Sequence, residues 1–468
     1  MRAGPSTVAW SELLHAAGAP LAVELDAAPV PDGARLVVVG DTRDLDALRA
    51  PGRAVVAIER AGERRNASAM AWGDITVPLD GVEVVALTPA VGETVVATDD
   101  AGHPLAAVSS RDGSVSLRLG VDLAAALWRL RLGDPALALT DRDGNGELQP
   151  ADALPRLDPS VTETPFADRV MARLMETLNA ALPCALPRLR SLPTGARAVL
   201  VITADQDYAD DAKLTAMGET LAGRGARATF LLTEPTVGRR PDLNVRGGAA
   251  PTLSLEAADA LLAQGHDLGV HPFPAAIEDV AAHVALTGQR LSLPVLFARN
   301  HHLRWIGRLD VPRAEASRGV AMNLDYMAVC DGRRPCVGFP GGAALPVMIA
   351  DGGARVPILQ QPTAVDDFSL RVNDYAQLAG AATALAAAAR ETITAARAAE
   401  APVVLNAHPT LYAFAPQWLA SVLSTPDLRA MSASEWLSFV LHRRASRVPA
   451  ARCGERVAAT LGEGVGLR

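Results

Sequence analysis

The chain has 468 residues, of which 49% are hydrophobic and 21% charged, and its formal net charge is −8. This length and composition are typical of an ordinary soluble globular protein of two or three domains. The negative charge argues against a nucleic-acid-binding surface. No run of about 18 uninterrupted apolar residues is present, so we expect no transmembrane segment.

The start of the sequence and the number of cysteines are informative about the cellular compartment of the protein. Residues 1–20 show neither the apolar core nor the small-residue cleavage site of a secretory signal, and we therefore expect a cytoplasmic location by default. Four cysteines are too few for a disulfide framework in a chain of this length. Cys330 and Cys336 would close a short loop under oxidising conditions, but without an export signal we expect reduced thiols.

Residues 1–135 are predicted to form a small α/β domain. The expected strands are 36–40, 54–58, 93–98, 104–109 and 114–119. Asp112-Gly113 is a hairpin signal between the last two strands, and residues 121–132 read as a closing amphipathic helix. This order is similar to that of glutamine-amidotransferase-like domains, but no cysteine precedes residue 184 to serve as their nucleophile. We expect a binding or packing role for this domain.

Residues 136–190 are predicted to be a connector with one unusual loop and a helix. Residues 141–152 (DRDGNGELQPAD) match the calcium loop of an EF-hand, and Gly146 stands where that loop turns sharply. The oxygen-bearing candidates are Asp141, Asp143, Asn145, Glu147, Gln149 and Asp152. Asp152 occupies the place of the usual bidentate Glu, and its shorter side chain weakens that ligand. The loop either binds Ca²⁺ in a structural role or is a polar linker turn.

Residues 191–445 show a regular alternation of strand and helix, and residues 446–468 form a tail. The expected strands are Ala198–Ile202, Ala228–Leu232, Asp267–Val270, Val295–Ala298, Val320–Leu324, Val356–Leu359 and Val403–Asn406. Examples of the expected helices are Asp211–Arg224, Leu255–Ala263, Pro312–Arg318 and Tyr375–Ala399. Seven such units predict an α/β fold, a (β/α) barrel of about seven strands.

Polar residues follow five of these strands directly. They are Thr203, Asp205 and Asp207; His271; Arg299, Asn300, His301 and His302; Asp325; and His408. In a parallel α/β barrel the carboxyl ends of the strands converge on one mouth, where such folds build active sites. A single histidine after a strand is more often structural, but agreement between five strand ends is hard to explain by packing.

Two carboxylates, several histidines and an arginine at one mouth suit a mononuclear site for a divalent metal, with zinc as the expected ion. Such an ion makes water a nucleophile near neutral pH. A second carboxylate can then act as general base, and a histidine can protonate the leaving group. The sequence contains no G-x-S-x-G motif and no cysteine near a strand end with a partner histidine, which argues against a covalent nucleophile.

At these residues the sequence resembles the polysaccharide deacetylase family of carbohydrate esterases, over about residues 198–444. Thr203–Asp207 (TADQD) occupies the place of the family's T-F-D-D-G motif. Gly265–His271 (GHDLGVH) is similar to the segment that carries the first histidine ligand, and Leu405–His408 (LNAH) to the segment that carries the general acid. The resemblance implies a metal-dependent hydrolase that acts on C–N bonds other than peptide bonds.

The sequence departs from the family pattern at the metal ligands. Gln206 stands in place of the second aspartate, although Asp207 follows and would face the same side as Asp205 in an extended segment. Ala275 stands where the second histidine ligand is expected. Two histidines follow the arginine where the family has R-x-P, so His301 or His302 would supply the third ligand. The chain therefore resembles a divergent member of the polysaccharide deacetylase family.

By its resemblance to the family, Asp205 would be the general base and His408 the general acid. Asp207, His271 and either His301 or His302 would hold the metal ion, and Arg299 would orient Asp205 or contact the substrate. The implied reaction removes an N-acetyl group from a carbohydrate. Two alternatives remain open: a non-catalytic barrel that binds a glycan or a partner, and a metal-independent amidohydrolase that acts on a small molecule. The sequence does not indicate an oligomeric state.

Overall fold

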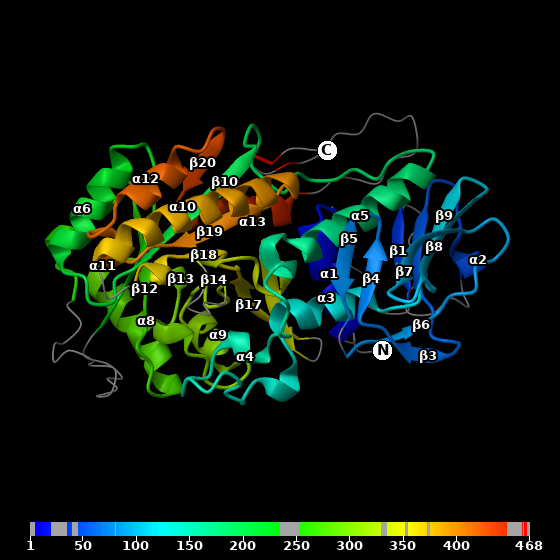
Figure 1. Cartoon of the computed structure of the whole chain (residues 1–468), viewed down its shortest axis with the longest axis horizontal. Helices are drawn as coiled ribbons and strands as arrows, with labels where there is room; N and C mark the ends of the chain where they lie inside the picture. Colours follow the sequence, from blue (N-terminus) through cyan, green and yellow to red (C-terminus); the bar gives the residue numbers. More distant parts are fainter. Residues whose placement is uncertain are drawn as a thin grey trace. The chain divides into compact units, whose positions relative to one another are not determined.

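The structure is a computed structural model that describes residues 5–19, 35–39, 45–79, 81–234, 252–328, 335–351, 354–371, 375–446, 461 and 463–465. The chain forms two compact units (Figure 1). Unit 1 comprises Met1–Leu130, Phe166–Ser191 and His442–Arg468, and unit 2 comprises Arg131–Pro165 and Leu192–Leu441. Among the described residues, no helix has the length and apolar character needed to cross a membrane.

Unit 1 is built on a seven-stranded mixed sheet with the order β1-β2-β9-β8-β7-β4-β5, and β3 pairs with β6 separately. The strands are β1 Leu36–Val39, β2 Ala54–Ile58, β3 Arg64–Asn66, β4 Ala69–Trp72, β5 Ile75–Pro78, β6 Glu83–Val85, β7 Thr94–Asp99, β8 Pro104–Arg111 and β9 Ser114–Leu119. The helices are α1 Pro5–Ala16, α2 Leu45–Leu48, α3 Leu123–Leu132 and α5 Phe166–Ala181. The five strands expected here are confirmed, whereas β3–β6 carry too short an apolar pattern to be predicted.

Two local features stabilise unit 1: the turn between β8 and β9, and the buried apolar face of α5. The residues Asp112 and Gly113 have φ of 52° and 72°, which gives the β8–β9 hairpin the left-handed turn that Asp-Gly favours. Helix α5 buries Phe166, Val170 and Leu174, which recur every four residues on one face. This face explains why α5 packs against β5, β8 and β9.

Unit 2 contains an eleven-stranded sheet of alternating α/β type. The strands are β10 Ala198–Asp205, β11 Thr229–Leu232, β12 Asp267–Val270, β13 Phe297–Ala298, β14 Met322–Asn323, β15 Cys336–Val337, β16 Val347–Asp351, β17 Ala354–Gln360, β18 Val365–Asp366, β19 Pro402–Asn406 and β20 Leu428–Met431. The helices are α4 Pro150–Ala153, α6 Asp211–Ala222, α7 Leu255–Ala263, α8 Ile277–Leu291, α9 Asp310–Ala316, α10 Tyr375–Ala398, α11 Pro409–Tyr412, α12 Gln417–Leu423 and α13 Ala433–Ala445. All seven expected strands are confirmed.

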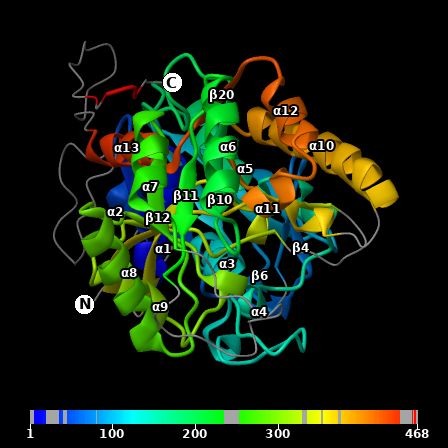
Figure 2. The same cartoon turned by 90° about the vertical axis from the view of Figure 1, so that its left-hand side faces the viewer.

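The strands β18, β19, β10, β11, β12, β13, β14 and β17 follow one another as parallel neighbours. Strand β17 pairs with β14, and β18, a few residues later in the chain, pairs with β19. The segment 361–364 between them is irregular, so the described ladders form a curled sheet and not a continuous closed barrel. Helices α6 and α7 pack against each other, and α7 and α8 contact β12 (Figure 2).

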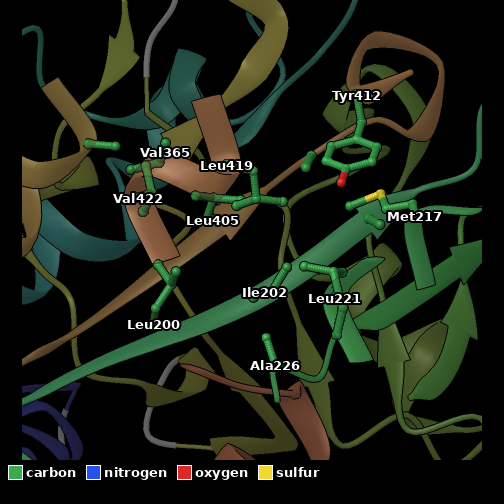
Figure 3. Packing of buried hydrophobic residues seen from close by; sticks show 14 of the residues in the cluster. Leu200, Ile202, Met217, Leu221, Ala226, Val365, Leu405, Tyr412, Leu419 and Val422 are labelled. Atoms are coloured by element: carbon green, nitrogen blue, oxygen red, sulfur yellow. The ribbon is translucent and has the colours of Figure 1, made fainter. Parts of the chain in front are cut away.

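The two faces of this sheet have different roles, because side chains alternate along a strand. On β10, Leu200 and Ile202 belong to a hydrophobic core with residues of α6, α7, α10 and α12 (Figure 3). On β19, Leu405 belongs to the same core. The intervening residues Asp205 and Asn406 therefore point to the opposite face. Both strands are apolar along most of their length, and their polar side chains on this face stand at the carboxyl ends.

The cysteines differ from the expectation of reduced thiols. Cys184 and Cys336 each take part in a disulfide bond. Cys330, which the sequence suggested as a partner for Cys336, lies outside the described residues. Spacing along the chain did not reveal that Cys184 is bonded, because disulfide connectivity depends on distances in the folded state.

Candidate metal centre

Three side chains converge on one point at the carboxyl ends of the strands. Asp207, His271 and His301 each offer a ligand atom, and these atoms lie within 4.8 Å of one another. Asp207 Oδ1 is 3.0 Å from His271 Nε2 and 3.7 Å from His301 Nε2. All three residues are buried. One carboxylate and two imidazoles are a donor set that zinc accepts.

Asp207 reaches this point through a turn and not through the extended segment expected from the sequence. Its φ is 46°, a left-handed conformation that non-glycine residues rarely adopt. Gln206 points away from the cluster, where its side chain accepts a hydrogen bond from the backbone N–H of Thr233 and donates to the carbonyl of Ala209. Gln206 therefore anchors the turn that brings Asp207 beside the histidines.

The ring of His271 is fixed by a backbone contact. Its Nδ1 donates a hydrogen bond to the carbonyl of Arg299 at 2.7 Å, which aims Nε2 at Asp207. Burial lowers the pKa of His271, but Asp205 and Asp207 more than offset this and raise it above its usual value. A histidine held by a carbonyl on one nitrogen is the usual arrangement of a metal ligand, since it fixes the ring orientation.

The structure distinguishes the two consecutive histidines. His301 lies between the rings of Phe273 and His302, at centroid distances of 3.8 Å and 4.1 Å. Burial lowers the pKa of His301 well below its usual value and keeps the imidazole neutral. The side chain of His301 faces Asp207, whereas His302 is exposed and does not belong to the ligand grouping. Among the described residues, His301 is therefore the candidate that joins Asp207 and His271.

Asp205 lies beside this cluster in a fully hydrogen-bonded position. Arg299 Nη1 donates to Asp205 Oδ1 at 2.8 Å, and Asn406 Nδ2 donates to Asp205 Oδ2 at 2.9 Å. Arg299 is completely buried and also donates to the hydroxyls of Thr203 and Thr363. Both oxygens of Asp205 are thus held in place, by Arg299 directly after β13 and by Asn406 at the end of β19.

On the other side of Asp207 lies His408, whose Nε2 is 3.6 Å from Asp207 Oδ2. Its Nδ1 donates to Asp367 Oδ1 at 2.6 Å, and its backbone N–H donates to Asp367 Oδ2 at 2.8 Å. Burial opposes the charged form, but Asp367 and Asp207 together raise the pKa of His408 to about 10. The imidazole is therefore protonated at neutral pH, with Nε2–H directed into the site.

The segment that carries Arg299 and His301 rests on a buried polar network. Asp325 accepts hydrogen bonds from the backbone N–H and the side chain of Asn300, at 2.6 Å and 2.8 Å. Glu315 accepts from Asn300 and from Asn323. Burial, reinforced by Asp325, raises the pKa of Glu315 well above its usual value. Asp325, which follows β14, thus fixes the segment that carries Arg299 and His301 through its hydrogen bonds to Asn300. It is not part of the grouping around Asp207.

The solvent side of the cluster carries an arginine and two aromatic rings. Arg371 Nη2 lies 3.4 Å from Asp207 Oδ2, and its guanidinium stacks 4.3 Å above the ring of Phe368. Tyr208 lies edge-on to His301 with 6.3 Å between the ring centroids. Arg371, Phe368 and Tyr208 are each more than a third exposed, whereas Asp207 is buried.

The loop 141–152 has the compact shape expected of an EF-hand-like sequence. Asp141 accepts hydrogen bonds from the backbone N–H groups of Gly144 and Gly146 at 2.7 Å and 2.9 Å. Carboxylate oxygens of Asp141, Asp143 and Asp152 lie within 4.8 Å of one another. Both oxygens of Asp152 accept backbone N–H groups, from Arg142 and Gln149. Calcium binding at this loop stays a prediction from the sequence.

The residues around the three candidate ligands fit a divalent ion. His301 is neutral and buried, and its Nδ1 has no hydrogen-bond partner among the described residues. The carboxylate of Asp207 is kept in its charged form, because His408 and His271 hold its pKa low against the effect of burial. A charged carboxylate and a neutral imidazole are the protonation states that metal binding requires, and His271, whose pKa is raised, would release its proton when the ion binds.

Four residues of this site were not recognised in the sequence as functional. Asp366 and Asp367 read there as a turn or helix start, although Asp366 ends the short strand β18, as Asp205 ends β10, and Asp367 follows it directly. Asn406 was seen only as part of a strand, and Asp366 Oδ2 accepts a hydrogen bond from its Nδ2 at 2.9 Å. Arg371 follows the short helical turn Asp367–Leu370 and not a strand end, and nothing in the sequence pattern marks it.

No protein-family model matches the chain, and no curated protein matches it. Solved structures that are similar to it are carbohydrate deacetylases and their relatives, the group that the motifs resemble. The chitin deacetylase of Colletotrichum lindemuthianum is 14% identical, with a TM-score of 0.30 over 52% of this chain and 88% of that one. A CE4 family pseudoenzyme from Bacillus anthracis is 11% identical, with a TM-score of 0.32 over 52% and 66%.

A third similar structure, the carbohydrate deacetylase Agd3, spans both units. It covers 97% of this chain and 89% of its own, at 10% identity and a TM-score of 0.36. At TM-scores this low, the roles of individual residues rest on the contacts within this chain.

Proposed function

We propose that unit 2 is a zinc-dependent hydrolase that removes an N-acyl group, most simply acetyl, from an amino sugar. The observation that carries this proposal is the arrangement of the site: Asp207, His271 and His301 meet at one point, Asp205 Oδ1 lies 3.9 Å from His271 Nδ1, and His408 Nε2 lies 3.6 Å from Asp207 Oδ2. A candidate base and a candidate acid beside a candidate metal centre are what hydrolysis of an amide requires.

In this proposal Asp207, His271 and His301 hold the ion, which would polarise the acyl carbonyl and make water a stronger acid. Asp205 accepts a proton from the attacking water as the new C–O bond forms. Arg299 and Asn406 keep both oxygens of Asp205 oriented, so the carboxylate needs no rearrangement. His408 gives its Nε2 proton to the leaving nitrogen when the C–N bond breaks, and the products are a free amine and acetate.

We also infer that the parallel strands of unit 2 form the wall of a barrel around this site. The segment from β17 to β18 supports it, because it pairs with β14 at one end and with β19 at the other. The three groupings of possible ligand side chains among the described residues all lie in unit 2. We therefore assign unit 1 a binding or packing role.

The function is tested by acetate release. Zinc-loaded protein is expected to release acetate from N-acetylated oligosaccharides. The release should stop after treatment with a chelator and resume when zinc is returned. Activity of the metal-free protein would instead indicate a metal-independent amidohydrolase. Glycan binding without acetate release, at any metal content, would indicate a non-catalytic barrel. Either result would overturn the proposal.

The contact between His408 and Asp367 gives a pH prediction. The Asp367 carboxylate raises the pKa of His408, so its removal in Asp367→Asn lowers that pKa. A general acid is lost as pH rises through its pKa, and the alkaline limb of kcat should therefore move to lower pH, by about one unit or more. We would measure kcat from pH 6 to 10 for both proteins. An alkaline limb at the same pH in both would show that His408 is not the proton donor.

A further inference from the structure

The turn that carries His301 has an unusual backbone. The two residues that follow, His302 and Leu303, have φ of 56° and 54°. Consecutive left-handed conformations at residues with side chains are rare, and they persist only when the surrounding structure holds them. Within the turn itself, the backbone N–H of Leu303 donates to the carbonyl of Asn300. The contacts that fix this turn therefore decide where the His301 ring lies.

Three consecutive residues of the loop 141–152 hold the turn. Gln149 Nε2 donates to the carbonyl of His302 at 2.7 Å. The carbonyl of Leu148 accepts the backbone N–H of Trp305 at 2.6 Å. The carboxylate of Glu147 lies 3.4 Å from Arg304.

The hydrogen bonds of the turn also reach the segment that follows His271. Arg304 also donates to the carbonyl of Pro274, which lies three residues after His271. The backbone N–H of His301 donates to the carbonyl of Pro272 at 2.8 Å. The loop, the turn and the segment after His271 are thus joined by contacts that do not involve the side chains of Asp207, His271 or His301.

The loop is braced by its own hydrogen bonds and by the core residue that follows it. Arg142 donates to the carbonyl groups of Asp152 and Leu154 at 3.0 Å and 2.9 Å. Leu154, two residues after the loop, is 6% exposed and packs in a hydrophobic cluster that also contains Tyr326. The loop is therefore a fixed support and not a loosely attached linker.

We infer that Gln149 and Glu147 are positioning residues of the metal centre, which hold the 300–305 turn so that His301 meets Asp207 and His271. This inference rests on the proposed function. It gives the loop 141–152 a role that does not depend on whether the loop binds calcium. Neither side chain touches the metal or the substrate, so their effect should appear in the affinity for the ion. Loss of such supporting contacts typically weakens metal binding about 10- to 100-fold.

The test is the affinity of the metal-free full chain for zinc, measured by competition with a chromophoric chelator. Gln149→Glu keeps the length of the side chain but replaces the N–H donor by an acceptor that faces the His302 carbonyl. Glu147→Gln removes the charge beside Arg304. Gln289→Glu makes the same chemical change as Gln149→Glu at an exposed position of α8 and serves as the control. Thermal unfolding of each metal-free protein reports on folding separately.

We expect Gln149→Glu and Glu147→Gln to raise the Kd for zinc about tenfold or more, with metal-free unfolding temperatures close to that of the wild type, and Gln289→Glu to bind as the wild type does. If Gln149→Glu does not fold, Glu147→Gln carries the test. Wild-type affinity in both variants would overturn this inference alone. A wild-type protein that does not bind zinc would overturn the proposed function, and this inference with it.

Discussion

Asp205→Asn is expected to lower kcat for acetate release by about 10²- to 10⁴-fold, which is the usual contribution of a general base. The amide has nearly the shape of the carboxylate, and its oxygen can still accept the hydrogen bond from Arg299. It cannot accept a proton from water near neutral pH, so the loss should appear in kcat. Steady-state kinetics on the zinc-loaded variant would measure it. Zinc content should stay at the wild-type value, because Asp205 is not among the three candidate ligands.

The same substitution leaves the buried charge of Arg299 without an anionic partner. Breaking a buried ion pair from one side costs about 3 to 5 kcal/mol, so the unfolding temperature should fall. The activity is therefore compared well below that temperature, beside Asp259→Asn, an exposed aspartate of α7. If the folded, zinc-loaded Asp205→Asn protein keeps wild-type turnover, Asp205 is not the base.

Substitution of His301, the third candidate ligand, is expected to lower kcat about as much as Asp205→Asn does. The cause differs, because this variant should lose the ion. His301→Ala removes one of two nitrogen donors from the centre, and the protein should lose both the ion and its activity. His302→Ala alters the neighbouring residue, which stacks on His301 but lies outside the ligand grouping. It should keep the ion, with a modest loss of affinity from the missing ring contact.

The alternation of strands and helices in unit 2 could be predicted because its seven expected strands lie in largely apolar runs of four or five residues separated by amphipathic helices. The strands of unit 1 were harder to predict from the sequence, since strands such as Arg64–Asn66 are only three residues long and polar. The barrel prediction went further than the described ladders allow. The segment between β17 and β18 is irregular, and no periodic pattern reports such a break.

The site was predicted in part for a physical reason. Asp205, His271, Arg299 and His408 all stand at carboxyl ends of buried strands, and parallel strands bring these ends together. The choice between His301 and His302 could not be made, because it depends on the left-handed backbone of His302. Asp367 was missed because its strand has only two residues, so nothing in the sequence marked it as a strand end.

The central claim is that Asp207, His271 and His301 hold one divalent ion, and metal content tests it most directly. Plasma mass spectrometry on untagged wild-type protein, His301→Ala and His302→Ala, each incubated with zinc and then desalted, would measure the number of ions per chain. We predict about one ion in the wild type, none in His301→Ala and about one in His302→Ala. A wild-type protein that stays empty, or a His301→Ala protein that keeps its ion while His302→Ala loses it, would contradict this account of the site.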